Sequence, residues 1–321
     1  MNKILKLTGS PALTPLTTVA LLLLMFGLGA IYFPGFGSVQ VLFNLLIDNA
    51  YLLVLAVGMT FVILSGGIDL SVGSVLALTT MLCGFFLTNW HWSAPAVIVS
   101  VLVIGFVFGT LMGVLIHYFK LQAFIVTLAG MFLARGLCYV IGINSITIAD
   151  PFFTTMSQFQ LPLFGGFISL GVIIGLTVLV AAIYIAHFTS FGRTMYAIGG
   201  NEQSALMMGL PVGRAKILVY GFSGFCAALA GLLFSFYMLS GYALHAQGAE
   251  LDAIASVVIG GTLLTGGVGY VAGTVSGVLV LGMIQTMIAF DGSLSSWWTK
   301  IVIGGLLLIF CLVQKLMLRA R

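Results

Sequence analysis

Long runs of apolar residues, separated by only a few charged positions, constrain this chain more than any other feature. Lys, Arg, Asp and Glu make up 6% of its 321 residues and hydrophobic residues make up 61%, whereas an ordinary soluble domain is about 25% charged. A soluble fold could not cover its surface with so few charges, because exposed apolar patches would merge and aggregate. The same composition excludes a disordered chain, a coiled coil, a secreted disulfide scaffold and a nucleic-acid-binding protein. The chain is therefore expected to be an all-α polytopic membrane protein.

The apolar runs predict about ten membrane-spanning helices. A helix that crosses the hydrocarbon core needs about 20 mostly apolar residues. Candidate segments lie at roughly 15–33, 50–64, 71–88, 95–117, 122–141, 166–187, 217–238, 252–264, 270–290 and 299–315. The first follows Lys3 and Lys6 and has no convincing small-residue cleavage site, so it is interpreted as a retained span rather than a signal peptide.

The basic residues predict how these spans are oriented, because Lys and Arg accumulate on the cytoplasmic side. With the N-terminus inside and ten spans, nine of the 11 basic residues fall on the inner side: Lys3, Lys6, Lys120, Arg193, Arg214, Lys216, Lys315, Arg319 and Arg321. The exceptions are Lys300, at an outer edge, and Arg135, within the fifth span. The tryptophans fall at outer edges, as an interfacial aromatic belt would. Both termini are therefore expected in the cytoplasm.

Two spans carry glycine at every fourth position, which places the glycines on one helix face. These glycines are Gly105, Gly109 and Gly113 in the fourth span, and Gly269, Gly273 and Gly277 at the ninth. Such a face lets a neighbouring backbone approach closely. Close packing inside the bundle is the simpler interpretation, and a seam between two copies of the chain is the alternative.

The second and eighth spans are too short to cross a bilayer and end in glycine pairs. At 1.5 Å per residue they extend only ~21 Å and ~18 Å, short of a ~30 Å hydrocarbon core. The breaks contain Ser65-Gly66-Gly67 and Thr265-Gly266-Gly267, where Gly67 and Gly267 are expected to allow tight turns. Short, glycine-interrupted segments at matching places in two halves point to a transport path. The candidate path residues are Ser65, Gly66, Gly67, Asp69, Ser71, Gly266, Gly267 and Arg135.

Asp69 and Arg135 each have two interpretations. Asp69 either caps the third span through backbone amides or contributes a polar ligand to the path. Arg135 is an intramembrane cation, which usually indicates function, yet its long side chain could extend outward to the headgroups.

The longest polar stretch, residues 188–216, is predicted to be a cytoplasmic loop. Residues 202–208 are expected to form a short helix that Asn201 caps and Gly209 closes. Its apolar residues Ala205, Met207, Met208 and Leu210 lie outside the bilayer and need a partner. That partner is either the underside of this protein or another subunit.

Four motifs occur in order along the chain: AVGMTFVILSGGIDLSVGS at 56–74, VTLAGMFLARG at 126–136, FGRTMYAIGGNEQSA at 191–205 and GAELDAIASVVIGGTLLTGGVG at 248–269. Together they resemble the membrane permeases of bacterial carbohydrate ABC importers of the ribose and galactose type. The segment DGSLSSWWTKI at 291–301 resembles a galactofuranose-importer permease more closely than a ribose one.

The resemblance implies a permease that transports a monosaccharide, galactofuranose- or ribose-like, across the inner membrane. Its partners would be a second permease subunit (an identical copy or a paralogue), ATP-binding-cassette ATPase subunits and a periplasmic sugar-binding protein. It also implies that the segment 192–209 docks on the ATPase. The residues assigned to this coupling loop are Gly192, Arg193, Gly199, Gly200, Asn201, Glu202, Ala205 and Gly209. No sugar-binding residue is carried over, because selectivity in the family resides mainly in the binding protein.

Two other transport mechanisms remain as alternatives: an ion-coupled secondary sugar transporter that uses Asp69 and Arg135, and a passive channel. The sequence contains no G-x-x-x-x-G-K-[ST] string, so ATP and Mg²⁺ are expected on a separate ATPase subunit. No nucleophile–base pair or paired carboxylates stand out, and the four cysteines are too scattered for a metal site or a disulfide framework. The chain is therefore expected to have no catalytic residue, metal or cofactor of its own.

Overall fold

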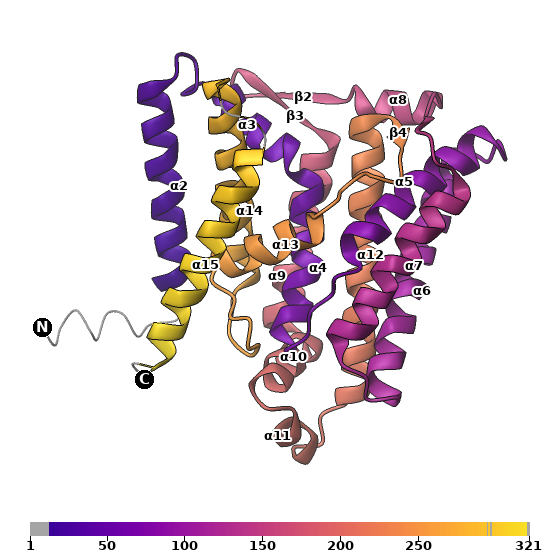
Figure 1. The fold of residues 1–321 in the computed structure, drawn as a ribbon, viewed down its shortest axis with the longest axis vertical. Coiled ribbons are helices and arrows are strands. Elements are labelled where there is room, and N and C mark those ends of the chain that lie inside the picture. The colour runs from indigo at the N-terminus through magenta and orange to yellow at the C-terminus, as the bar shows by residue number, and fades with distance from the viewer. Residues whose placement is uncertain (1–12, 294, 296, 320–321) are drawn as a thin grey trace, which may run out of the picture.

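The computed structural model describes residues 13–293, 295 and 297–319, which form a bundle of helices with two small strand pairs (Figure 1). The helices are α2 (Leu13–Tyr32), α3 (Val39–Asp48), α4 (Ala50–Leu64), α5 (Val72–Thr88), α6 (Ala94–Tyr118), α7 (Ala123–Ile141), α8 (Pro151–Ser157), α9 (Leu170–Phe188), α10 (Ser190–Gly200), α11 (Glu202–Met207), α12 (Val212–Met238), α13 (Ala249–Ile259), α14 (Val271–Asp291) and α15 (Trp297–Arg319).

Among the described residues, five helices are long and apolar enough to cross a membrane: α6, α7, α9, α12 and α14. A sixth span arises if α3 and α4, which meet at a 54° bend, are counted as one. Each of the ten predicted segments contains a helix, but several are shorter than a full crossing, so the ten-span count stays a prediction. The predicted N-terminal charges Lys3 and Lys6 lie outside the described residues.

Helix α4 is the centre of the bundle. All its residues except Tyr51 are buried, and α12, α13, α9 and α14 surround it. A helix that is apolar on every side, as α4 is, can be stable only when neighbours cover it all round. The second span therefore forms the core of the protein and contributes little lipid-facing surface.

The glycine stripe of α6 packs against α12 within the chain. A Cβ on Gly105 would lie 2.6 Å from the carbonyl oxygen of Gly224, and one on Gly113 would lie 2.8 Å from the Cα of Ile217. A Cβ on Gly109 would overlap the carbonyl of Tyr220. The predicted packing role is confirmed, and the alternative of a dimer seam is wrong for this stripe because its own chain occupies it.

The stripe of α14 has the same role. A Cβ on Gly277 would lie 2.9 Å from the backbone nitrogen of Gly260, and one on Gly273 would overlap the Gly260 carbonyl. Helices α13 and α14, which flank the second glycine break, are thereby held backbone to backbone.

Two antiparallel strand pairs correct the purely helical prediction. Strand β1 (Ile146–Thr147) pairs with β4 (Ser240–Gly241), and β2 (Gln160–Leu163) forms a hairpin with β3 (Gly166–Ser169). The hairpin and α8 lie across the end of the bundle opposite α11 (Figure 1). The predicted span 166–187 was therefore wrong at its start, because residues 166–169 are strand β3.

One further helix and two further boundaries differ from the prediction. The short amphipathic helix α3 was not predicted. Helix α13 runs over Ala249–Ile259 rather than 252–264. Helix α12 begins at Val212, so residues 212–216 of the predicted loop 188–216 belong to it. For α12 and α13 a polar or glycine-rich border hid where regular hydrogen bonding begins or ends.

Candidate functional site

Helices α10 and α11 form a segment that protrudes from one end of the bundle (Figure 1). The Thr189 hydroxyl caps α10 by accepting a hydrogen bond from the Gly192 amide at 3.2 Å. The Asn201 side chain caps α11 by accepting from the Ser204 amide at 2.9 Å. Gly209 has φ +75°, a conformation that favours glycine. The predicted short helix, its cap and its stop are confirmed.

The exposed apolar surface of α11 differs from the predicted one. Leu206, Met207 and Met208 are 58%, 87% and 66% exposed, whereas Ala205 is fully buried. The prediction that Ala205 lies on the open apolar face is therefore wrong: it packs against this chain, and its neighbours face outward. We call Leu206, Met207 and Met208 the α11 tip. Arg193 and Glu202 are exposed as well.

An ion pair fixes α11 to α12. The Lys216 Nζ lies 2.6 Å from the Glu202 Oε2, and both side chains are partly exposed. Such a pair contributes roughly 0–1 kcal/mol. Its role is to orient the helix rather than to hold the fold together.

The two broken spans turn at left-handed glycines. Gly66, Gly266 and Gly267 have φ of +80°, +82° and +74°, a region that residues with a side chain rarely occupy. The expected tight turn at Gly267 is confirmed. The expected turn at Gly67 is wrong, because Gly66 adopts it; Gly67 instead leaves room for the hydroxyl of Tyr220.

Both breaks meet the end of α10 at one point. The Gly267 amide donates to the Leu64 carbonyl at 3.0 Å. A Cβ on Gly266 would lie 2.8 Å from the Gly66 Cα, and one on Gly267 would lie 2.6 Å from the Gly200 nitrogen. A Cβ on Gly199 would overlap both the Leu64 carbonyl and the Gly267 amide. We call Gly66, Gly199, Gly200, Gly266 and Gly267 the glycine junction. Sequence reasoning named all five residues but assigned them to separate features.

A tyrosine that sequence reasoning missed adds a second link to this junction. The Tyr196 hydroxyl, from α10, donates to the Gly269 carbonyl at 2.9 Å. Burial, and to a lesser extent the neighbouring Tyr270, raises the pKa of Tyr196 above its ordinary value, so the hydroxyl stays protonated and can donate. Only its place in the predicted loop could have drawn attention to it.

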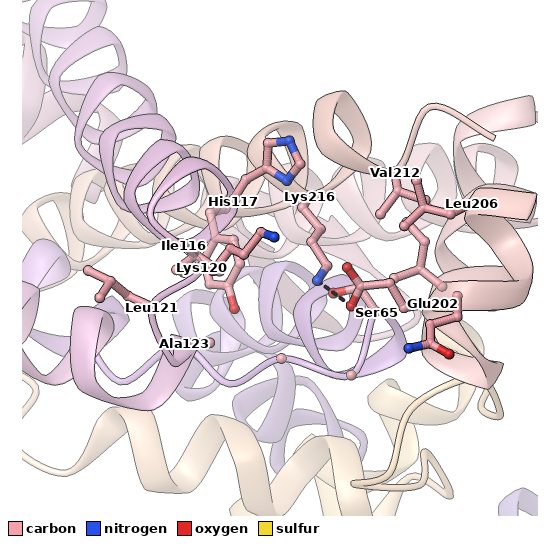
Figure 2. Close-up of a pocket in the computed structure, with 15 residues that line it drawn as sticks. Ser65, Ile116, His117, Lys120, Leu121, Ala123, Glu202, Leu206, Val212 and Lys216 are labelled. Carbon is pink, nitrogen blue, oxygen red and sulfur yellow. Dashed lines mark hydrogen bonds and ion pairs between the residues drawn. The ribbon is translucent and has the colours of Figure 1, made fainter. Parts of the chain in front are cut away.

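A cavity of about 690 Å³ opens beside the first break, at the α11 end of the bundle. Ser65, Gly66 and Gly67 line it on one side. Figure 2 shows Lys120 and Lys216 extending into it, with Glu202 beside Lys216. Cavities of 300–1,000 Å³ are typical of small-molecule sites. Both apolar and polar side chains line the cavity, since its other lining residues include Ile116, Leu121, Gln203 and Tyr220.

Asp69 is fully buried and hydrogen-bonded. Its Oδ1 accepts from the Ser71 amide at 3.0 Å and from the Ser71 hydroxyl at 2.7 Å, and its Oδ2 accepts from the Ser223 hydroxyl at 2.7 Å. Ser71, not Asp69, is the N-cap of α5, and α5 has no side-chain cap bond. Asp69 accepts a backbone amide only from Ser71, so it closes the turn before the helix and ties that turn to α12. Neither Asp69 nor Ser71 lines the cavity.

Arg135 lies away from both breaks. Its Nη1 donates to the carbonyls of Ala243 at 2.5 Å and His245 at 2.9 Å, in the segment that follows β4. The cation is therefore satisfied by backbone acceptors of another element, a pairing typical of intramembrane charges. Among the residues described by the structure, no three His, Cys, Asp or Glu side chains gather where they could hold a metal.

These features define a polytopic helical membrane protein whose protruding two-helix segment contacts two broken helices. Residues 41–311 match the family model described as branched-chain amino acid transport system / permease component. The chain belongs to this permease family.

Several curated proteins are similar over nearly their whole length. The inner membrane ABC transporter permease protein YjfF of Escherichia coli (strain K12) is 51% identical over 91% of this chain and 89% of its own. The fructose import permease protein FruG of Bifidobacterium longum (strain NCC 2705) is 42% identical, with 94% and 90% covered. The ribose import permease protein RbsC of Escherichia coli (strain K12) is 38% identical, with 92% and 91% covered. No solved structure matches the chain.

Proposed function

We propose that this chain is the membrane permease of an ATP-driven importer of a monosaccharide. The observation that carries the proposal is the α11 tip: three large apolar side chains stand exposed on a segment that contacts both broken spans. Apolar anchors of this kind bind in grooves of partner proteins. An ATP-binding-cassette ATPase subunit would supply the groove and would bind ATP and Mg²⁺, since the sequence of this chain contains no G-x-x-x-x-G-K-[ST] string.

The remaining partners follow from the relatives. Proteins named as importers of ribose and fructose are similar over nine-tenths of this chain. We expect a periplasmic binding protein to deliver the sugar and a second permease subunit, identical or paralogous, to complete the path. Galactofuranose as the sugar is supported only by the resemblance of 291–301, of which residues 294 and 296 lie outside the described part.

The proposed topology has ten spans, with both termini and the α10–α11 segment in the cytoplasm. Four basic residues support it, because Lys120, Arg193, Arg214 and Lys216 lie in or beside the elements at the α11 end. The cavity beside Ser65 and Gly66 would then be the cytoplasmic end of the sugar path.

Energy coupling distinguishes this proposal from a secondary transporter. In proteoliposomes with the ATPase and binding protein, we expect sugar uptake to require ATP on the α11 side and to continue after ionophores collapse every ion gradient. The Asp69→Asn variant should keep this ATP-dependent uptake, because the Asp69 carboxylate already accepts hydrogen bonds from Ser71 and Ser223 and has a structural role. Uptake driven by a gradient without ATP, and lost in that variant, would contradict the proposal.

A further inference from the structure

We infer that Gly199 at the end of α10 is the residue through which movement of the coupling segment reaches both broken spans together. The inference rests on the proposed function and adds to it the point of transmission. It assigns Gly199 a positioning role, with Tyr196 in support.

One element, the end of α10, touches both breaks. The backbone of Gly199 lies against Leu64 and Gly66 of the first break and against Gly266 and Gly267 of the second, and the backbone of Gly200 lies against Gly267. The breaks also touch each other, through the hydrogen bond from the Gly267 amide to the Leu64 carbonyl. No displacement of α10 toward the bundle can therefore move one break and leave the other in place.

Backbone atoms make this contact, without intervening side chains. A side chain between two elements can absorb a small movement by changing rotamer, whereas backbone atoms in van der Waals contact cannot. At Gly199 even a methyl group would overlap the Leu64 carbonyl and the Gly267 amide. Small shifts of packed elements of this kind are the usual means by which distant sites are coupled.

A side-chain hydrogen bond also links α10 to the second break. The Tyr196 hydroxyl bonds to the Gly269 carbonyl at 2.9 Å, so α10 holds the second break at two positions, one turn apart on the helix. Pulling α10 away from the bundle would draw Gly269 with it. The link therefore acts in both directions, toward the bundle and away from it.

The chain offers a pair of variants that each add one methyl group to a helical glycine. A Cβ on Gly199 has no room, whereas a Cβ on Gly136 of α7, outside the glycine junction, meets no atom within 4 Å. We expect Gly199→Ala to lower ATP-dependent sugar uptake about tenfold or more, within the usual range of coupling between sites. Gly136→Ala should transport as the wild type does.

The readout separates coupling from docking. In Gly199→Ala the ATPase subunit should still co-purify, because the α11 tip is intact, while hydrolysis should no longer respond to sugar-loaded binding protein. Uptake and stimulated hydrolysis at wild-type levels in Gly199→Ala would overturn the inference. If the wild type itself neither bound the ATPase nor used ATP, the proposed function would fail instead.

A second variant keeps the test valid if Gly199→Ala does not fold. Tyr196→Phe preserves the ring and removes only the hydroxyl that bonds to Gly269. We expect it to keep ATPase binding and its thermal unfolding temperature, and to turn over more ATP per sugar imported than the wild type. An unchanged ratio of ATP to sugar in Tyr196→Phe would contradict the inference.

Discussion

Replacing Met207 and Met208 with aspartate is expected to abolish both ATPase association and sugar uptake. These side chains are 87% and 66% exposed, so the substitutions should not disturb the permease itself. Anchors at the centre of an interface contribute about 2 kcal/mol or more each, and burying an unpaired carboxylate costs several kcal/mol more. Affinity should therefore fall by at least about a thousandfold, since each 1.4 kcal/mol is tenfold. The loss of affinity is measured as the amount of ATPase that co-purifies with tagged permease.

The matched control lies at the opposite end of the bundle. Phe164 is 83% exposed at the tip of the β2–β3 hairpin, and Phe164→Asp should leave ATPase association unchanged. If the Met207 and Met208 double variant retained the ATPase at wild-type levels, the coupling surface would lie elsewhere. Ala205 is unsuitable for this test because it is buried within the chain, so Ala205→Arg should disrupt the packing of α11 before any partner binds.

The second large effect is expected at the contact of α6 with α12. A Cβ on Gly109 would overlap the Tyr220 carbonyl and lie 3.1 Å from the Gly224 Cα. Gly109→Ile would therefore force the two helices apart along the most extensive helix pair of the bundle. Overpacking costs about 1–3 kcal/mol even where side chains can adjust, and here only backbone can move. We expect the variant to lose most of its yield of folded, monodisperse protein in detergent.

A glycine of α7 provides the control for this prediction. A Cβ on Gly136 meets no atom within 4 Å, so Gly136→Ile adds the same bulk to an open helix face. Its yield and thermal unfolding temperature should match the wild type. Equal behaviour of Gly109→Ile and Gly136→Ile would show that the glycine stripe does not set the packing of α6.

The helices were predictable because hydrophobicity is a local property of the sequence. Each of the ten predicted segments contains a helix, and the cap at Asn201 and the stop at Gly209 follow from side-chain chemistry within a few residues. The hairpin β2–β3 was missed because its strands are only four residues long and stand between two apolar helices. A run such as Gly166–Ser169 continues the apolar pattern of the span that follows it.

The candidate site was predictable as a set of parts but not as an assembly. The glycine pairs and the polar loop were identified from composition and spacing, yet the junction joins Gly66, Gly199 and Gly267, which are distant in sequence. No periodicity encodes such a contact. Nor does the sequence show which glycine of a pair turns: Gly66 takes the left-handed conformation, while the Tyr220 hydroxyl occupies the space where a side chain on Gly67 would lie.

The burial of Ala205 has a similar cause. A helix of six residues, Glu202–Met207, has one face toward the bundle and one away from it, and its sequence is apolar on both. Only the position of α11 against α12 decides that Ala205 turns inward and Met207 outward. Asp69 was open to two interpretations because its second partner, Ser223, lies 154 residues further along the chain.

The most direct test of the account is a single cysteine in place of Met207, in a chain whose native cysteines Cys83, Cys138, Cys226 and Cys311 are replaced by alanine. A short bifunctional thiol–amine reagent would be applied to inner-membrane vesicles of either orientation. The account predicts reaction only from the cytoplasmic side, and a crosslink from this position to the ATP-binding-cassette subunit. Reaction from the periplasmic side, or a crosslink to the periplasmic binding protein, would contradict it.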